Sequence, residues 1–241
     1  MARTHVVGGR AVAARRGWDW VAAGWALFCK QPRTWLAWVA VLVAIILVLL
    51  MAHPLFGRLL LIGLGPLLMA GIACGCRELD EGRAMKFSHL FAGFGAAAGQ
   101  LAALGAICAV ATAVIVFGVV SASGVDLSAI GSGQNVAAMP PAQLMAVLLA
   151  MLVILGLLVP VAMAAWFAPL LVVFDGRRAT GAMRESFVAS LRNIMPMLVY
   201  GVVTLVLIVA ATLPALLGWL VLLPVLAASV YTSYKDVFTT A

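Results

Sequence analysis

Long runs of apolar residues alternate with short polar segments along the whole chain. A helix needs about 20 apolar residues to cross the hydrocarbon core of a bilayer. Two such runs, 35–52 and 59–76, are separated by a short stretch that begins with His53-Pro54, which is typical of a tight turn. A third run covers 97–120. The pattern therefore predicts membrane-spanning helices rather than the amphipathic helices of a soluble protein.

A fourth apolar run covers 143–174 and contains no charged residue. As one helix it would measure about 48 Å, against a hydrocarbon core of about 30 Å. We expect one long span there, bent at Pro160 or Pro169 or tilted, since proline kinks a helix. The segment before it, Ser121–Pro141, is rich in Gly, Ser and Ala and has Asp126 as its single charge, which predicts a flexible loop.

The last apolar run extends from Ile194 to Tyr234, and Pro214 and Gly218 divide it into two shorter spans. The fold predicted is all-α, a polytopic transmembrane helix bundle behind an N-terminal segment, 1–33. The predicted transmembrane domain covers 34–241, with spans at 35–52, 59–76, 97–120, 143–174, 196–213 and 220–234.

Three of the polar segments have the periodicity of amphipathic helices. In Gly17–Lys30 the apolar side chains are spaced as on one helical face. The segments Ala84–Phe94 and Gly181–Met195 repeat this pattern, and each precedes an outward-going span. Apolar faces with aromatic residues and basic flanks are typical of helices that lie in the membrane interface. The residues assigned to that face of the first segment are Trp18, Val21, Ala22, Trp25, Phe28 and Cys29. The residues predicted to lie at the interface are Arg15, Arg16, Trp18, Trp25, Phe28, Phe87, Phe91, Phe187 and Leu191.

The positions of the basic residues predict the orientation of the chain. Of its 15 lysine and arginine residues, only Arg58 falls in a segment on the outer side of the six-span arrangement. Basic residues concentrate in cytoplasmic loops, so both termini should be cytoplasmic and the membrane a bacterial inner membrane. The net charge of +7 then indicates anionic phospholipid as a partner and not nucleic acid, because the basic residues lie between apolar runs.

Candidate chemistry is sparse. The predicted spans contain no ionisable side chain, whereas proton relays, cation sites and voltage sensors use such groups at membrane depth. We predict no catalytic residue, cofactor, disulfide or metal site. Cys29, Cys74, Cys76 and His89 should lie at one level, but a C-x-C spacing is weakly specific for zinc, and cysteine also packs as a small apolar residue.

Two arginines, Arg177 and Arg178, are candidates for binding a lipid headgroup. They follow Asp175-Gly176, which predicts a turn at the end of the fourth span. Their guanidinium groups suit a lipid phosphate, although snorkelling to the headgroup region is the simpler interpretation.

Several short segments resemble a family of uncharacterised proteobacterial polytopic inner-membrane proteins. The resemblance covers nearly the whole chain and implies its location and topology, but no activity. The segments are the opening Met-Ala-Arg, the helix with Trp18, Trp20 and Trp25 that leads into Gln31-Pro32, Cys76–Gly82, Leu90–Phe94, and Ala168-Pro169-Leu170 leading to Phe174-Asp175. A fainter similarity, at Met183–Phe187 and Ser190–Asn193, is to the membrane domain of glycerophosphodiester phosphodiesterases. No segment here resembles their catalytic domain.

The sequence leaves three functional hypotheses. The first is a non-enzymatic protein that organises the membrane or serves as an accessory or assembly subunit, with other membrane subunits or further copies of itself as partners. The second is a transporter or channel for a neutral or anionic small solute, which a polar cavity in mid-membrane would favour. The third is a lipid-modifying enzyme at the cytoplasmic interface, which requires His89, Asp175 and Arg177 to converge in one cleft.

Overall fold

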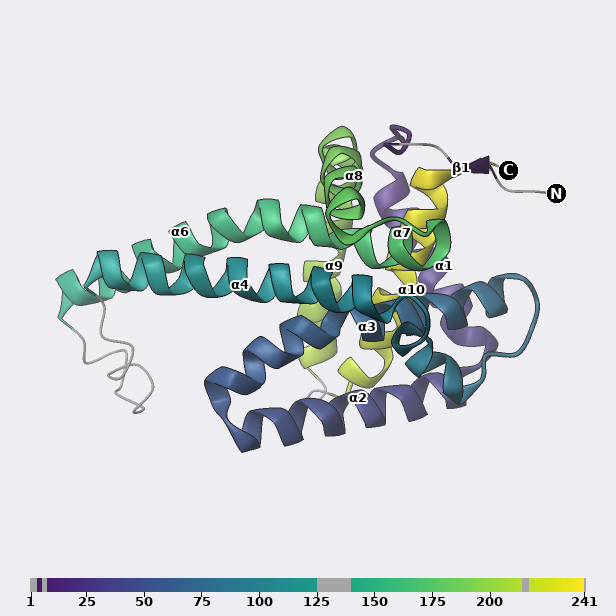
Figure 1. The fold of residues 1–241 in the computed structure, drawn as a ribbon, viewed down its shortest axis with the longest axis horizontal. Coiled ribbons are helices and arrows are strands. Elements are labelled where there is room, and N and C mark those ends of the chain that lie inside the picture. Colours follow the sequence, from purple (N-terminus) through teal and green to yellow (C-terminus); the bar gives the residue numbers. More distant parts are fainter. Residues whose placement is uncertain (1–3, 6–7, 125–139, 214–216, 241) are drawn as a thin grey trace.

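A computed structural model describes residues 4–5, 8–124, 140–213 and 217–240, and these form an almost entirely helical protein (Figure 1). Two-residue strands, β1 (Thr4–His5) and β2 (Thr239–Thr240), pair in antiparallel fashion and join the two ends of the chain. The helices are α1 (Arg16–Lys30), α2 (Pro32–Ala52), α3 (Pro54–Asp80), the 3₁₀ helix η1 (Phe87–Phe94), α4 (Ala98–Ser123), α6 (Pro141–Trp166), α7 (Ala168–Asp175), α8 (Ala179–Arg192), α9 (Ile194–Thr212) and α10 (Trp219–Phe238).

Six helical segments of the described chain are long and apolar enough to cross a membrane. They are α2, α3, α4, α6 together with α7, α9 and α10. The prediction of an all-α chain with six such helices is confirmed, and the protein is a multi-pass integral membrane protein. The predicted loop around Asp126 lies outside the described residues.

The helix boundaries follow local chemistry. α2 ends at Ala52, and the ring nitrogen Nδ1 of the next residue, His53, accepts a hydrogen bond of 3.1 Å from the backbone N–H of Phe56 at the start of α3. Phe167 separates α6 from α7, and Pro169 lies in the first turn of the new helix, where its missing N–H costs no hydrogen bond. Pro160 stays inside α6. The bend expected in the fourth span is therefore at Phe167.

The second predicted surface helix is shorter than expected. The segment before η1 is not helical, because the backbone N–H of Met85 donates to the side-chain oxygen of Gln31 at 2.8 Å. Lys86 is extended, and η1 begins only at Phe87. The remaining predicted surface helices correspond to α1 and α8.

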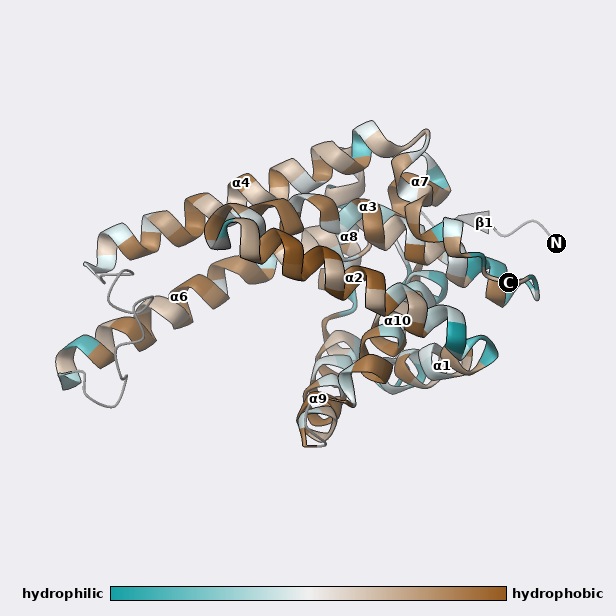
Figure 2. Ribbon diagram, turned by 90° about the horizontal axis from the view of Figure 1, so that it is seen from below, coloured by the Kyte–Doolittle hydropathy of each residue, from teal (hydrophilic) through white to brown (hydrophobic). Residues whose placement is uncertain are grey.

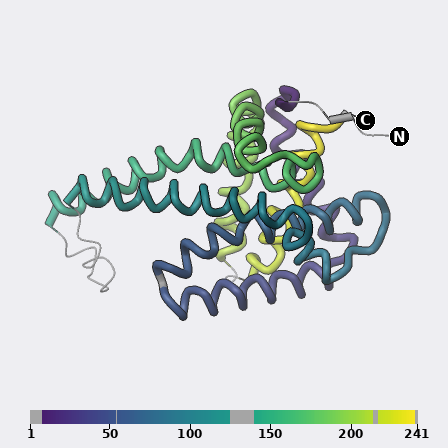
Figure 3. The backbone as a smooth tube through the Cα atoms, viewed as in Figure 1, coloured from purple at the N-terminus to yellow at the C-terminus, as the bar shows by residue number. Residues whose placement is uncertain are grey.

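The span helices diverge from a common region. The α2–α3 and α4–α6 hairpins extend in one direction, whereas α9 runs across them (Figures 1 and 2). The backbone trace shows the helices meeting at the end where both termini lie (Figure 3). Hydrophobic residues cover α2, α4 and α6, while hydrophilic residues gather around the meeting point (Figure 2). We call this region, where α1, α8 and the ends of α3 and α10 meet, the polar end.

The core lies at this polar end. The most apolar window of α10 has 56% of its residues buried, while that of the α6–α7 segment has only 6%. Helices approach each other closely at glycine residues, because glycine has no side chain to keep them apart. A Cβ atom at Gly71 would collide with the backbone carbonyl of Leu90, and one at Gly105 with that of Gly63. Away from the core, the spans leave most of their apolar surface open.

Candidate functional site

Helix α1 is packed into the protein through a face of small and large residues. A Cβ atom at Gly24 would lie 2.6 Å from the carbonyl oxygen of Val225, so α1 and α10 approach each other closely. Gly17 makes a similarly close approach to the start of α9. Trp20, on the same side of α1, is buried. The buried residues of α1 are Gly17, Trp20, Val21, Gly24, Leu27 and Phe28.

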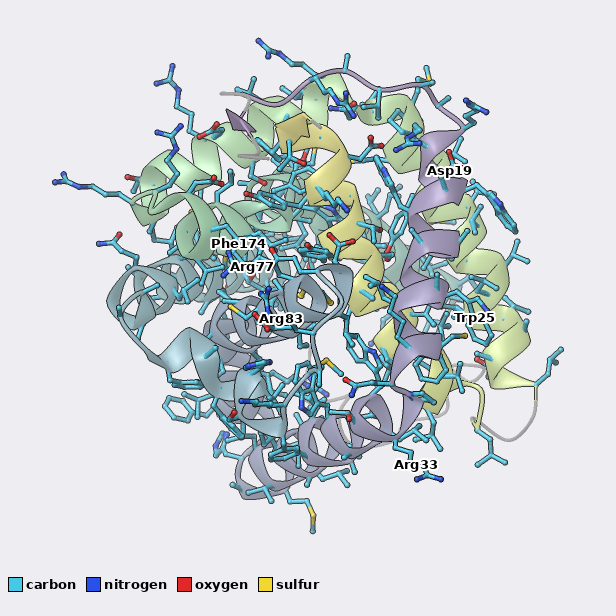
Figure 4. All side chains as sticks on the ribbon, turned by 90° about the vertical axis from the view of Figure 1, so that its right-hand side faces the viewer. Asp19, Trp25, Arg33, Arg77, Arg83 and Phe174 are labelled. Carbon is cyan, nitrogen blue, oxygen red and sulfur yellow. The ribbon has the colours of Figure 1, made fainter. Side chains whose placement is uncertain are left out.

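The tryptophans predicted to lie at the membrane interface are on α1 next to this buried face. Trp18 is 59% exposed and Trp25 is 51% exposed, and both border a groove that α1 forms with α9 and α10 (Trp25 is labelled in Figure 4). Trp18, Val21, Ala22 and Trp25 share one side of α1, where they line the same groove, but Val21 and Phe28 of the predicted face are buried against the protein. Glycine hid the contact face, because it contributes nothing to an apolar pattern.

Asp236, near the end of α10, connects the two ends of the chain. Its side chain is 5% exposed and is held by two arginines, Arg10 and Arg16. Arg10 Nη2 lies 3.0 Å from Oδ1, and Arg16 Nε donates to Oδ2 at 2.6 Å. Trp20 Nε1 donates to the same oxygen at 2.9 Å. The hydrogen bond to Asp236 raises the pKa of the Arg16 guanidinium, so this cation is held in its charged form.

Residues 8–12 cross α8 and α10 as a strap. The backbone N–H of Gly8 donates to Glu185 Oε1 at 2.9 Å, and that of Arg10 donates to the Val237 carbonyl at 2.9 Å. Asn193, at the end of α8, accepts from the Val12 N–H through Oδ1 and donates to the Arg10 carbonyl through Nδ2, both at 2.9 Å. The strap therefore fastens the N-terminal segment to α8 and to the end of α10.

A second charged pair joins α3 to α10. Lys235 Nζ lies 2.8 Å from Asp80 Oδ2, and the hydroxyl of Tyr231 donates to the same carboxylate at 3.2 Å. Next to it, Lys30 Nζ donates to the carbonyl oxygen of Leu79 at 2.8 Å. The ends of α1, α3 and α10 thus meet around three charged side chains.

The arginines predicted to hold a lipid headgroup have different surroundings. Arg177 Nε forms an ion pair with Glu185 at 3.2 Å, so part of its charge is already matched within the protein. Arg178 is exposed immediately before α8. Next to this turn, the hydroxyl of Tyr234 donates to Asp175 at 2.6 Å, and the guanidinium of Arg77 lies 4.7 Å from the centre of the Phe174 ring (Figure 4).

The other predicted interface residues lie on the surface to different degrees. Phe87 and Phe91 of η1 are exposed and their rings are 6.2 Å apart. On α8, Leu191 is exposed and Phe187 is half-buried. Arg15 is exposed at the start of α1, whereas Arg16 takes a protein partner.

The structure does not gather the residues considered for metal binding or catalysis. Among the described residues, no group of three or more His, Cys, Asp or Glu side chains is placed to hold a metal ion. Cys76 is fully buried and Cys29 is exposed, and both are free thiols. His89 Nδ1 accepts from the backbone N–H of Lys86, while Asp175 is bonded to Tyr234.

Within the described part of the chain, three hollows border α10. One is a charged cleft of about 610 Å³ at the polar end. The charged cleft is lined by Arg10, Arg16, Asp19, Trp20, Ala23, Ala26, Leu27, Lys30, Asp80, Thr232, Lys235, Asp236 and Thr239. The others are apolar grooves, one of about 530 Å³ between α1, α9 and α10 and one of about 350 Å³ between α2, α3 and α10. No ionisable side chain lines either apolar groove.

No family model, curated protein or solved structure matches the chain. Its function therefore has to follow from the geometry of the chain itself.

Proposed function

We propose that this protein is a non-enzymatic assembly subunit of the bacterial inner membrane, which organises neighbouring membrane helices around its own diverging spans. One observation carries the proposal. The six apolar helices spread from a core at the polar end, and the α6–α7 segment has only 6% of its most apolar window buried. A chain of this shape offers long apolar surfaces to its surroundings.

Glycines on the open helix faces favour neighbouring helices over lipid alone. At Gly99, Gly118, Gly156 and Gly201, an added Cβ atom would meet nothing within 4 Å. Small residues let membrane helices approach closely, and they are enriched where such helices pack. The glycines of the chain's own core, such as Gly71, already contact backbone. The open glycines are therefore available for contacts with helices of other chains.

The distribution of polar groups supports assembly over transport. A path for a neutral or anionic small solute would be favoured by a polar cavity at membrane depth. Both apolar grooves beside α10 lack ionisable side chains, and the charged cleft is at the helix ends. A lipid-modifying enzyme would need reactive groups in one place, whereas none of the three hollows includes His89, Asp175 or Arg177.

The proposed orientation places the polar end in the cytoplasm, with both termini. The charged cleft alone contains four basic side chains, and Arg58 lies by the α2–α3 turn, away from the termini (Figure 1). Such an imbalance follows the positive-inside rule. The exposed Trp18 and Trp25 then come to lie at the level where aromatic residues meet lipid headgroups.

Substitution of an open glycine tests the assembly role. We expect Gly156→Leu to reduce the amount of co-purifying membrane protein, or of self-association, at least fivefold after extraction in a mild detergent. The added side chain meets nothing within this chain, so its own fold should be retained. Gly181→Leu is the matched control, because Gly181 is equally open but lies on α8 outside the spans.

Two results would contradict the proposal. One is a purified chain that is monomeric and carries only lipid. The other is an equal loss of partners in the Gly156→Leu and Gly181→Leu variants, because the effect would then not depend on the span surface. The first result would leave the chain as a lipid-organising protein without a protein partner.

A further inference from the structure

The charged cleft has an elongated form set by two neighbouring helices. α1 supplies residues from Arg16 to Lys30, and the last turns of α10 supply the facing wall. Between the charged ends, Ala23 and Ala26 leave room because their side chains are small. A volume of about 610 Å³ falls within the range of small-molecule sites, roughly 300–1,000 Å³.

The charges in the charged cleft are not fully matched. It contains four basic side chains and three carboxylates, so its formal charge is 4 − 3 = +1. Arg10 and Arg16 share Asp236, and Lys235 pairs with Asp80.

Lys30 differs from the other cations. Its ammonium group donates to the carbonyl of Leu79, and within the described part of the chain no carboxylate lies within ion-pair distance of it. Lys235 is bonded to Asp80, the residue that follows Leu79, so the two ammonium groups lie at the same end of the cleft. The ammonium group of Lys235 is therefore paired with a carboxylate, whereas that of Lys30 is not.

We propose that the charged cleft binds a phosphate ester, with its phosphate held between the ammonium groups of Lys30 and Lys235. Ammonium groups bind phosphate as point charges and keep further N–H donors after their present contacts. The organic part of the ligand lies along Ala23 and Ala26 towards Arg16, whose guanidinium can bond to hydroxyl groups. A phospholipid headgroup and a soluble phosphate ester share this chemistry. The inference does not depend on the assembly role, because it concerns only the polar end.

Binding is measured on the full chain in a maltoside detergent that contains no phosphate. Inorganic phosphate and glycerol 3-phosphate are the soluble probes, followed by phosphorus NMR line broadening. Phosphatidylglycerol and diacylglycerol, its counterpart without phosphate, are the lipid probes, followed by native mass spectrometry. Retention of phosphatidylglycerol alone identifies a headgroup site, and binding of the soluble probes identifies a soluble ester.

Lys30→Gln should weaken binding of the phosphate probes about fivefold, because one basic residue near an anion contributes about that factor. Lys30→Arg should retain binding. Asp19→Asn should not weaken it, since Asp19 lies at the Arg16 end of the cleft and the change breaks only an exposed contact of 3.5 Å to Arg16. Arg33→Gln is the matched control, as Arg33 is exposed and does not line the cleft (Figure 4).

If Lys30→Gln lowers the yield of folded protein, Asp19→Asn keeps the test decisive, because a cleft variant that removes no cation should retain binding. The proposal is overturned if none of the phosphate probes binds, or if diacylglycerol binds as well as phosphatidylglycerol. It is also overturned if Lys30→Gln and Arg33→Gln change binding equally, or if Asp19→Asn weakens it.

Discussion

At the scale of single residues, Asp236 illustrates how a charge near one end of the chain organises the other end. Its carboxylate is hydrogen-bonded to Arg16, which is 220 positions away in sequence. A buried carboxylate is stable only when hydrogen bonds and opposite charges compensate for its lost hydration. Arg10, Arg16 and Trp20 supply this compensation together, so the contact specifies where the N-terminal segment docks.

We expect Asp236→Asn to destabilise the protein by roughly 1–3 kcal/mol, because the amide cannot match the two arginines and one buried acceptor is lost. Thermal unfolding of the detergent-solubilised protein measures the change. Limited proteolysis should show earlier cleavage after Arg10 and Arg16. Asp19→Asn provides the control: its contact with Arg16 is exposed, and such pairs contribute about 0–1 kcal/mol. An equal effect of both substitutions would mean that Asp236 does not anchor the N-terminus.

At the scale of secondary-structure elements, α1 has two apolar faces with different partners. One face packs on α9 and α10 through Gly17 and Gly24, and the other exposes Trp18 and Trp25 beside an apolar groove. The hydrophobic periodicity of the sequence is compatible with either face being buried, since both contain large apolar residues. Contact of the exposed tryptophans with lipid headgroups stays a prediction.

Docking of α1 can be tested at Gly24. We expect Gly24→Val to separate α1 from α10, because even the Cβ atom would lie 2.6 Å from the Val225 carbonyl and 2.9 Å from the Ser229 nitrogen. Hydrogen–deuterium exchange should then be at least tenfold faster in residues 16–30. Ala22→Val makes a similar change on the exposed face and should leave exchange nearly unaltered. Equal exchange in both variants would place α1 on the membrane surface instead of against the protein.

At the scale of the whole molecule, the arrangement of the spans around the polar end brings the termini together and directs the α2–α3 turn away from them (Figure 1). Strands β1 and β2 and the strap over α8 close this end. At the opposite ends of the spans, side-chain hydrogen bonds among the described residues join only helices that follow each other in the chain, such as the one from Trp219 to Thr212 between α10 and α9. Disruption of the contacts at the polar end should therefore loosen the packing of every span.

The proposed topology predicts which side each segment faces. In a chain whose native cysteines are replaced, a cysteine at His53 should react with a membrane-impermeant maleimide from outside. A cysteine at Arg184 should react only after the membrane is opened, as should one in place of Lys86 or at the C-terminus. A reporter at Asp126 should be outside. The six-span arrangement would be refuted by a C-terminus that reacts only from the outer side.

The amino-acid sequence by itself determined the six apolar helices, the turn at His53-Pro54 and the asymmetry of basic residues. These properties are local, because the length of an apolar run and the backbone preference of proline act within one segment. For the same reason, the surface helices α1 and α8 were predictable, and η1 in part. Of the four basic residues that line the charged cleft, the sequence pattern singled out only Arg16, and as a residue of the membrane interface.

Only the tertiary structure decided which residues these elements bring together. Pairing of Asp236 with Arg16, and of Lys235 with Asp80, joins residues that are 220 and 155 positions apart. Such contacts depend on the packing of several helices, which no local pattern encodes. The buried face of α1 depended on Gly17 and Gly24, whose contribution is the absence of a side chain and becomes visible only beside a partner helix. The divergence of the spans likewise results from where the helices pack, because an apolar surface in lipid is equally stable at many angles.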